Sequence, residues 1–244
     1  MENPIKSPIN SQENIKEGVI AKSFLSNVFS YMAAALTITG VVAYWFGNDV
    51  GMQSMMYNVT LAGMSLNMFG YFVMFAPLGL VLLMSFGYQK LSAITLLGLF
   101  MVYSVLMGMS MSTIFLIYTS TSIVTTFLIS AGTFGVMAFL GYTTKTDLTK
   151  FGSLLMMGVI GIIIAMVVNM FIGSGTMDLI ISALGVLIFT GLTAYDVQKL
   201  KRIGSGVEYG KNETNKLVIM GALNLYLDFI NLFLFLLRFM GGRR

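Results

Sequence analysis

The sequence contains no cysteine and no histidine. Without cysteine there is no disulfide, no thiolate nucleophile and no Cys-ligated zinc or iron–sulfur centre, and the redox state of the compartment is left open. Without histidine there is no imidazole metal ligand, no Ser-His or Cys-His triad and no imidazole that titrates near neutral pH. Proton chemistry in this chain therefore falls to carboxylates, tyrosines and lysines.

Charged residues are also scarce. They make up 10% of the 244 residues, whereas 57% are hydrophobic, which leaves too little polar surface to keep a globular domain in water. The formal net charge is +4, but the basic residues lie between apolar runs and form no single patch with interleaved aromatic residues, so a nucleic-acid partner is not expected. The composition predicts a polytopic membrane protein surrounded by the lipid bilayer.

Seven apolar runs are long enough to cross about 30 Å of hydrocarbon, which takes roughly 20 helical residues. Residues 1–22 carry mixed charge together with Pro4 and Pro8, and are predicted to be a flexible cytoplasmic tail. Residues 23–244 are predicted to form one transmembrane domain, because no connection is long enough to bury a core of its own. The expected fold class is all-α integral membrane, a seven-transmembrane-helix bundle with spans at about 24–46, 68–86, 91–114, 118–140, 152–172, 179–200 and 217–238.

Lysine and arginine are distributed unevenly over the connections. Eleven of them lie before span one or at the connections that follow spans two, four and six. The connections that follow spans one, three and five contain none. Because basic residues near span ends resist translocation, the N-terminus is predicted to be cytoplasmic. We expect a multi-pass protein of the plasma membrane, which is the inner membrane in a bacterium.

The three remaining basic residues, Arg238, Arg243 and Arg244, do not fit this distribution. They lie outside the cell if the last span crosses the bilayer, and in the cytoplasm if it folds back as a re-entrant hairpin. Crossing is favoured, because residues 217–238 contain no glycine or proline after Gly221 that would break the helix.

Two aspartates lie inside apolar helical segments, Asp196 in the sixth span and Asp228 in the seventh. A carboxylate in a bilayer costs about 2.5–3.5 kcal/mol even on insertion scales, so intramembrane acids are functional candidates by default. On the seventh span Gly221, Asn224, Asp228 and Asn231 follow one another at helical spacing and share one face. A polar stripe of this kind is expected to face protein or water instead of lipid.

On the sixth span Thr193, Asp196 and Lys199 form a shorter stripe near the cytoplasmic end. The short connection makes spans six and seven antiparallel neighbours, so the two carboxyl groups can meet if span six crosses later than drawn or span seven projects into the cytoplasm. The alternative is that Asp196 pairs with Lys199 while Asp228 accepts hydrogen bonds from neighbouring helices. The polar segment 142–150 after span four either covers the mouth of this site or is a solvated connector.

If the two aspartates meet, like charges in a low-dielectric site cannot both ionise freely, so the pair would share a proton. When deprotonated, Asp196 and Asp228 would offer oxygen ligands to a divalent metal ion such as Ca2+, with the carbonyl groups of Asn224 and Asn231 nearby. Protons and Ca2+ would then compete for one site without any histidine.

Three segments resemble the Bax inhibitor-1 family, also called the transmembrane Bax inhibitor motif family: IFTGLTAYDVQKLK, ALNLYLDFINLFLFLLR, and GYTTKTDLTKFG after span four. The resemblance extends from Ser23 to Arg238. It implies a seven-helix bundle with the C-terminal helix central. It also implies a pH-sensitive cation leak, chiefly for Ca2+, controlled by an aspartate pair that maps onto Asp196 and Asp228.

The chain departs from the family pattern in one respect. Some members carry an arginine in the second span that latches one aspartate, whereas this chain has no arginine before Arg202. Such a latch would have to come from elsewhere or be absent. Lys90 is the only base near the second span, and we do not expect it to take this role.

The predicted function is therefore a passive Ca2+ leak channel, gated by protonation of the Asp196–Asp228 pair and supported along the ion path by Thr193, Asn224 and Asn231. Its partners would be Ca2+ and protons, with no organic cofactor, and the sequence does not indicate the oligomeric state. A proton-coupled secondary transporter and a membrane regulator of stress or cell death that transports nothing remain as alternatives.

An intramembrane aspartyl protease would also place two aspartates on adjacent spans. Catalysis would require the second aspartate on a glycine-rich segment that lets a substrate backbone approach. Here the bulky residues Leu225, Tyr226 and Leu227 precede Asp228. We therefore do not expect an enzyme.

Overall fold

The computed structural model describes residues 8–60, 63–207 and 212–243. Within these ranges, seven helices are long and apolar enough to cross a membrane, which confirms the all-α, seven-span membrane class. Between the first two of them lie the short helix α2 (Val50–Met56) and an antiparallel hairpin of β1 (Tyr57–Thr60) and β2 (Gly63–Leu66). The seven are α1 (Pro8–Asn48, apolar from Ile20), α3 (Met68–Gly87), α4 (Ala93–Met111) continued by α5 (Ile114–Ile117), α6 (Ser120–Thr143), α7 (Thr149–Ile172), α8 (Gly175–Ser205) and α9 (Asn212–Met240).

Most of the long helices begin at a polar side chain that caps the first turn. The side-chain oxygens of Asn67, Ser92, Thr119 and Ser174 accept hydrogen bonds from backbone N–H groups at the starts of α3, α4, α6 and α8. Such caps satisfy donors that the helix itself leaves without partners. Helix α7 ends at Gly173, which adopts a left-handed conformation with φ of 69° that glycine tolerates.

Three helices extend further than their apolar runs predict. Helix α1 begins at Pro8, so residues 8–22 of the predicted cytoplasmic tail are helical, while residues 1–7 lie outside the described chain. Proline is tolerated in a first turn, and few helix breakers follow it. Helices α8 and α9 likewise continue beyond the bilayer-length segments, because a helix that leaves the hydrocarbon needs no further apolar residues.

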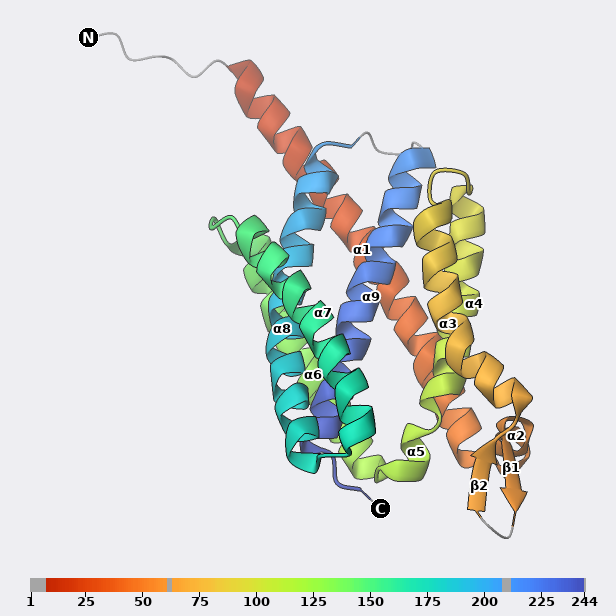
Figure 1. Ribbon diagram of the computed structural model, residues 1–244. Helices are drawn as coiled ribbons and strands as arrows, with labels where there is room; N and C mark the ends of the chain where they lie inside the picture. The colour runs from red at the N-terminus through yellow and green to blue at the C-terminus, as the bar shows by residue number, and fades with distance from the viewer. Residues whose placement is uncertain (1–7, 61–62, 208–211, 244) are drawn as a thin grey trace.

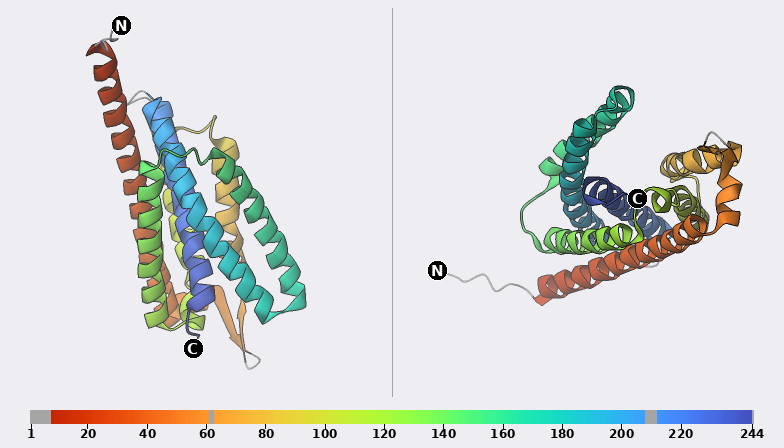
Figure 2. Two further views of the ribbon diagram at one scale, coloured as in Figure 1. Left: turned by 90° about the vertical axis from the view of Figure 1, so that its left-hand side faces the viewer. Right: turned by 90° about the horizontal axis from the view of Figure 1, so that it is seen from below.

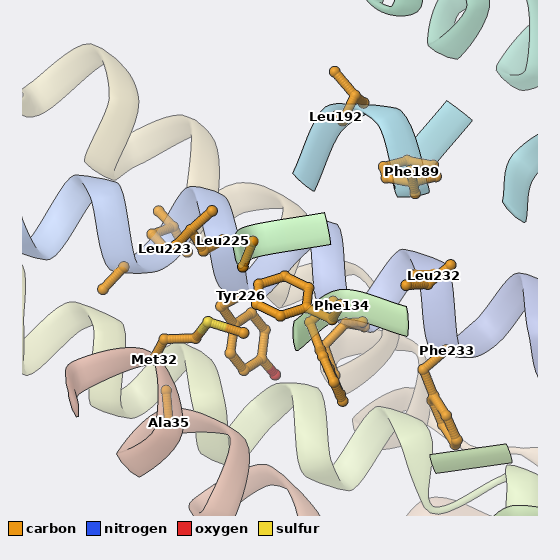
Figure 3. Packing of buried hydrophobic residues seen from close by; sticks show 14 of the residues in the cluster. Met32, Ala35, Phe134, Phe189, Leu192, Leu223, Leu225, Tyr226, Leu232 and Phe233 are labelled. Carbon is orange, nitrogen blue, oxygen red and sulfur yellow. The ribbon is translucent and has the colours of Figure 1, made fainter. Parts of the chain in front are cut away.

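Helix α9 is the most buried of the seven spans. In its most apolar window 67% of residues are buried, against 6% to 39% in the other spans. It packs on α1, α4, α6 and α8, as the two further views also show (Figure 2). The close-up of the core shows Leu223, Tyr226 and Phe233 of α9 between side chains of α1, such as Met32, and of α6, such as Phe134 (Figure 3). The least accessible of the described spans therefore packs on four of the others.

A buried polar contact crosses this apolar core. The hydroxyl groups of Tyr226 and Thr39 lie 2.7 Å apart, and the Thr39 hydroxyl donates to the carbonyl oxygen of Ser104 at 2.9 Å. Helices α9, α1 and α4 are thereby joined at one point by directional bonds.

The two ends of the bundle differ in what they carry. The start of α1, the turns α3–α4 and α6–α7, the end of α8 and the start of α9 lie at one end. The strands β1 and β2, the turn α7–α8 and the C-terminus lie at the other (Figure 1). Helix α9 runs between the ends as one helix of 29 residues, as expected for a crossing span and not for a re-entrant hairpin. The end that carries the start of α1 is the predicted cytoplasmic one.

Arg238, one of the three basic residues that did not fit the predicted charge distribution, has an acidic partner. It lies at the C-terminal end of α9, and its Nη1 is 3.4 Å from Oδ1 of Asp178 in the first turn of α8. A paired arginine contributes less net charge to this end of the bundle than its sequence position suggests.

Candidate functional site

Helices α8 and α9 pack as antiparallel neighbours with close glycine contacts. Gly221 of α9 lies against the side chain of Leu200, and Gly185 of α8 lies against the ring of Phe235. These two contacts fix the register, and Asp196 and Asp228 fall between them on the facing sides of the helices. The side chains of Asp196 and Asp228 hydrogen-bond each other.

The relative depth of the two aspartates follows from the helix ends. Helix α9 starts nine residues before Gly221, whereas α8 ends five residues after Leu200, the residue that Gly221 contacts. Helix α9 therefore projects beyond α8 by about one turn, roughly 6 Å at the helical rise per residue. The start of α9 thus extends past the end of α8 where the two helices pack with the carboxyl groups facing each other.

The two carboxyl groups differ in accessibility. Asp228 is buried, with 5% of its surface exposed, whereas Asp196 is half-buried. One oxygen of Asp228, Oδ2, has no hydrogen-bond partner among the described residues. A hydrogen bond between two carboxyl groups requires a proton on at least one of them. This oxygen is thus both buried and without a partner among the described residues.

The alternative partner of Asp196 is not used. No ion pair joins Asp196 and Lys199 within the part of the chain that the structure describes. The Lys199 ammonium is exposed and lies 6.0 Å from the centre of the Tyr195 ring, where a cation–π contact holds it. Its positive charge acts on both carboxyl groups only from a distance.

The two asparagines of the predicted stripe do not point at the carboxyl pair. Asn224 is exposed and Asn231 is half-buried, and neither has a hydrogen bond to another described residue. They lie beside Asp228 on the one face of α9 that is not covered, together with Met220, Leu227, Leu234 and Arg238. An amide without a protein partner needs water inside a membrane, because exposing it to hydrocarbon is costly.

Thr193, which we expected to support an ion path, is fully buried, and its hydroxyl donates to the carbonyl oxygen of Phe189 in the same helix at 2.8 Å. The structure therefore brings together only Asp196 and Asp228 of the five predicted site residues. No group of three or more acidic residues that could hold a metal ion occurs among the residues that were described. A cation at this pair would complete its shell with water or backbone oxygens.

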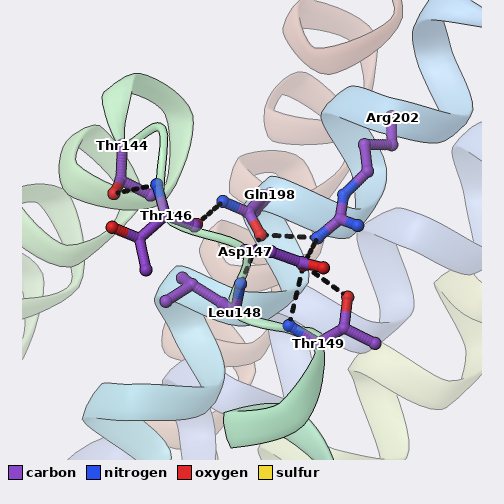
Figure 4. Close-up of polar contacts among 7 residues, drawn as sticks. All are labelled: Thr144, Thr146, Asp147, Leu148, Thr149, Gln198 and Arg202. Atoms are coloured by element: carbon purple, nitrogen blue, oxygen red, sulfur yellow. Dashed lines mark hydrogen bonds and ion pairs between the residues drawn. The ribbon is translucent and has the colours of Figure 1, made fainter.

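The polar loop between α6 and α7 is bound to the cytoplasmic half of α8 (Figure 4). Gln198, two residues after Asp196, accepts a hydrogen bond from the Leu148 amide at 2.9 Å and donates one to the Thr146 carbonyl at 2.8 Å. These bonds join residues about fifty positions apart, so they could not be predicted from local sequence patterns. The α6–α7 loop is therefore anchored to α8, and most of its residues are exposed.

Two basic residues strengthen this attachment. The Arg202 guanidinium lies 2.8 Å from Oδ1 of Asp147 in the loop, and Lys201 donates to the Tyr142 carbonyl at 2.8 Å. Hydrogen bonds from Thr149, and then the bond from Arg202, lower the pKa of Asp147 to about 2. Sequence reasoning assigned these bases only to membrane orientation and missed this second role.

The second-span arginine of some family members has no counterpart in this structure. Helix α3 packs mainly on α4, and Lys90 is exposed in the turn that follows α3. Within the described chain, no ion pair involves Lys90. The carboxyl pair is therefore held by its own hydrogen bond and by the α8–α9 packing.

Comparisons with known proteins agree with the resemblance seen in the sequence. The model of the family described as "Inhibitor of apoptosis-promoting Bax1" matches residues 21–244. An uncharacterized protein of Borreliella burgdorferi is 44% identical over 94% of this chain and 96% of its own length. The "Inner membrane protein YbhL" of Escherichia coli K12 is 42% identical over 91% of this chain and 93% of its own. An uncharacterized protein of Rickettsia prowazekii is 43% identical over 91% of both chains. With seven apolar helices and these relatives, the chain is a multi-pass membrane protein that belongs to the Bax inhibitor family.

Proposed function

We propose that this protein is a passive leak pathway for cations, chiefly Ca2+, and that protonation of the Asp196–Asp228 pair controls the leak. The observation that carries the proposal is the hydrogen bond between two carboxyl groups in a largely buried site, with one Asp228 oxygen unpartnered among the described residues. In this proposal the pair holds a proton when closed. Loss of that proton leaves two carboxylates that repel each other and attract a divalent cation.

The proposed route for the ion follows the uncovered face of α9. Asn224 and Asn231 lie on this face without protein partners, so water is the partner we assign to them. A hydrated strip beside the carboxyl pair would let an ion keep part of its hydration shell. We assign no catalytic role to the pair, in line with membership of a membrane-protein family whose relatives carry no enzyme names.

The proposed location is the inner membrane of a bacterium with the N-terminus in the cytoplasm. The name of the Escherichia coli relative and the distribution of lysine and arginine support this placement. The carboxyl pair would then be nearer the cytoplasmic end of the bundle, and the α6–α7 loop would lie on the cytoplasmic side of it.

The test is Ca2+ entry into liposomes that contain the purified protein and a Ca2+-sensitive dye, followed from about pH 5 to about pH 8. We expect entry to fall as the pair takes up a proton, and Asp228→Asn or Asp196→Asn to remove the pH response. Asp178→Asn is the matched control, because it alters an acid on the same helix that pairs with Arg238 and should leave the pH response intact.

The same liposomes separate the competing functions. Wild-type pH dependence in both pair variants would contradict the proposal. Ca2+ accumulation driven by a proton gradient alone would indicate a proton-coupled transporter. Absence of flux in every condition would favour a regulator that transports nothing.

A further inference from the structure

An apolar groove opens on the side of the bundle opposite to the uncovered face of α9. It has a volume of about 310 Å³ and lies between α1, the end of α4 with α5, and the first half of α6, with α9 as its floor. Its lining is almost wholly hydrocarbon. Leu36 and Ala43 come from α1, Phe127 from α6, and Phe229 and Phe233 from α9.

The groove opens sideways, toward the surroundings of the transmembrane helices. Tyr44 of α1 and Val124 of α6 stand at its rims and are 65% and 58% exposed. Gly40 also lines it, and a Cβ atom added there would meet no other atom within 4 Å. All of the lining helices belong to apolar spans, so the space is reached from the bilayer.

The backbone of an exposed arginine is held near one end of the groove. Beyond α9 the chain turns back onto the start of α6, where Thr119 donates to the Gly242 carbonyl at 3.1 Å and the Gly242 amide donates to the Ser122 hydroxyl at 2.9 Å. Arg243 pairs through its backbone with Tyr118 and is exposed. Ser120, two residues further along, lines the groove.

No ion pair involves Arg243 among the described residues. Asp49, which follows α1, accepts a hydrogen bond from the Met52 amide at 2.9 Å and so caps α2. Arg243 therefore presents an exposed cation beside an apolar groove. Those are the two features that an anionic amphiphile requires, a hydrocarbon chain on one side and a negative headgroup on the other.

We propose that the groove binds one acyl chain of an anionic phospholipid whose phosphate lies beside Arg243. The surrounding bilayer supplies this occupant, and its charge complements the arginine. The site explains why a basic residue is kept at the predicted outer end of the bundle, against the charge distribution of the rest of the chain. It is independent of the proposed ion leak, because neither aspartate lines the groove.

The bound chain would contact the segment of α9 that follows Asp228. Phe229 and Ile230 form part of the groove floor, and Thr39, which bonds Tyr226, lines its wall. A lipid in this position stabilises the packing of α9 from the side opposite to its uncovered face.

Native mass spectrometry of the full chain, released from micelles that contain equal amounts of phosphatidylglycerol and phosphatidylethanolamine, tests the site. We expect the wild type to retain one phosphatidylglycerol. Gly40→Leu places a side chain in the groove and should lower the retained lipid about tenfold or more. At Gly132 an added Cβ also meets nothing within 4 Å, but this residue does not line the groove, so Gly132→Leu should retain lipid like the wild type. Arg243→Gln should retain both lipids without preference.

A fluorescence experiment keeps the test valid if Gly40→Leu folds poorly. In a Trp45→Phe background, which removes the single tryptophan, Phe127→Trp reports from the groove and Leu128→Trp from the neighbouring lipid-exposed position. Brominated phosphatidylglycerol should quench Phe127→Trp more strongly than brominated phosphatidylethanolamine does. The two brominated lipids should quench Leu128→Trp to the same extent.

Equal quenching of both reporters by both lipids would overturn the proposal, as would wild-type lipid retention by Gly40→Leu. A dimer that dissociates in Gly40→Leu would show that a second copy of the chain fills the groove, and would also overturn it.

Discussion

At the scale of single residues, the two members of the carboxyl pair have unequal surroundings. Asp228 is buried on α9, the most buried of the described spans. Its Oδ2 atom would destabilise the fold by about 1–3 kcal/mol if it never had a hydrogen-bond partner. Asp196 is half-buried and has Lys199 within electrostatic reach. Asp228 is thus the residue whose retention most needs a functional reason, as its position deep in an apolar run already indicated from the sequence.

Asp147 can be compared with the carboxyl pair as a source of the expected pH response. Its pKa is lowered to about 2, below its ordinary value, by bonds from Thr149 and Arg202. A carboxyl group whose pKa is lower in the folded protein than in the unfolded chain stabilises the fold at pH values above its unfolded pKa. For Asp147, this stabilisation of the loop attachment is lost only as the pH falls toward 2. Asp147 therefore stays charged from about pH 5 to about pH 8 and cannot be the source of a pH response in that range.

We expect Asp147→Asn to loosen the loop while leaving the pH midpoint of Ca2+ entry unchanged. Hydrogen exchange at the Leu148 amide, which bonds Gln198, measures the first effect, and the liposome assay measures the second. A shift of the midpoint in Asp147→Asn would show that the loop titrates with the pair.

At the scale of elements, close glycine contacts decide which helices can approach. Gly141 of α6 lies against the backbone of Ala194 in α8, so any side chain there would push the two helices apart. Gly135 on the same helix is exposed and has open space where a Cβ would stand. The two glycines look alike in the sequence, and only one of them is a packing residue.

Gly141 and Gly135 give a matched test of α6–α8 packing. Gly141→Val should lower the free energy of unfolding by about 1–3 kcal/mol, because backbone cannot yield as a side chain can. Gly135→Val should be close to neutral. Thermal unfolding of both variants in the same detergent measures the difference, and equal melting temperatures would mean that the α6–α8 contact does not limit stability.

The elements also show what the sequence could and could not predict. The seven spans follow from apolar runs of bilayer length, and the meeting of Asp196 with Asp228 follows from a short connection between antiparallel helices. The polar ends of α8 and α9 and the start of α1 were missed, because hydropathy ends where the bilayer ends. Gln198 and its bonds to the α6–α7 loop were missed, because they join segments distant in the sequence.

The predicted ion-path residues illustrate the limit of helical periodicity. Asn224 and Asn231 share a face with each other, and the spacing correctly separates them from the aliphatic faces of α9. Helical spacing could not predict that α8 buries Asp228 and leaves the two asparagines uncovered. That difference depends on the crossing of two helices and not on either sequence alone.

At the scale of the whole molecule, the orientation in the membrane can be measured directly, because the chain has no native cysteine to remove. Ser205 at the end of α8 and Ser65 in β2 are both exposed and lie at opposite ends of the bundle (Figure 1). With the N-terminus in the cytoplasm, a membrane-impermeant maleimide should label Ser65→Cys in intact cells and Ser205→Cys only after lysis. The reverse pattern would place the N-terminus outside.

The burial of α9 has a consequence for biogenesis. Helix α9 leaves the ribosome after the other six spans, yet it supplies contacts to α1, α4, α6 and α8. Until it is inserted, those helices have no common partner, and Asp196 stands in the bilayer without the carboxyl group that it bonds. Assembly of this bundle must therefore be completed from its last span, and a nascent chain stalled before α9 is a natural substrate for membrane quality control.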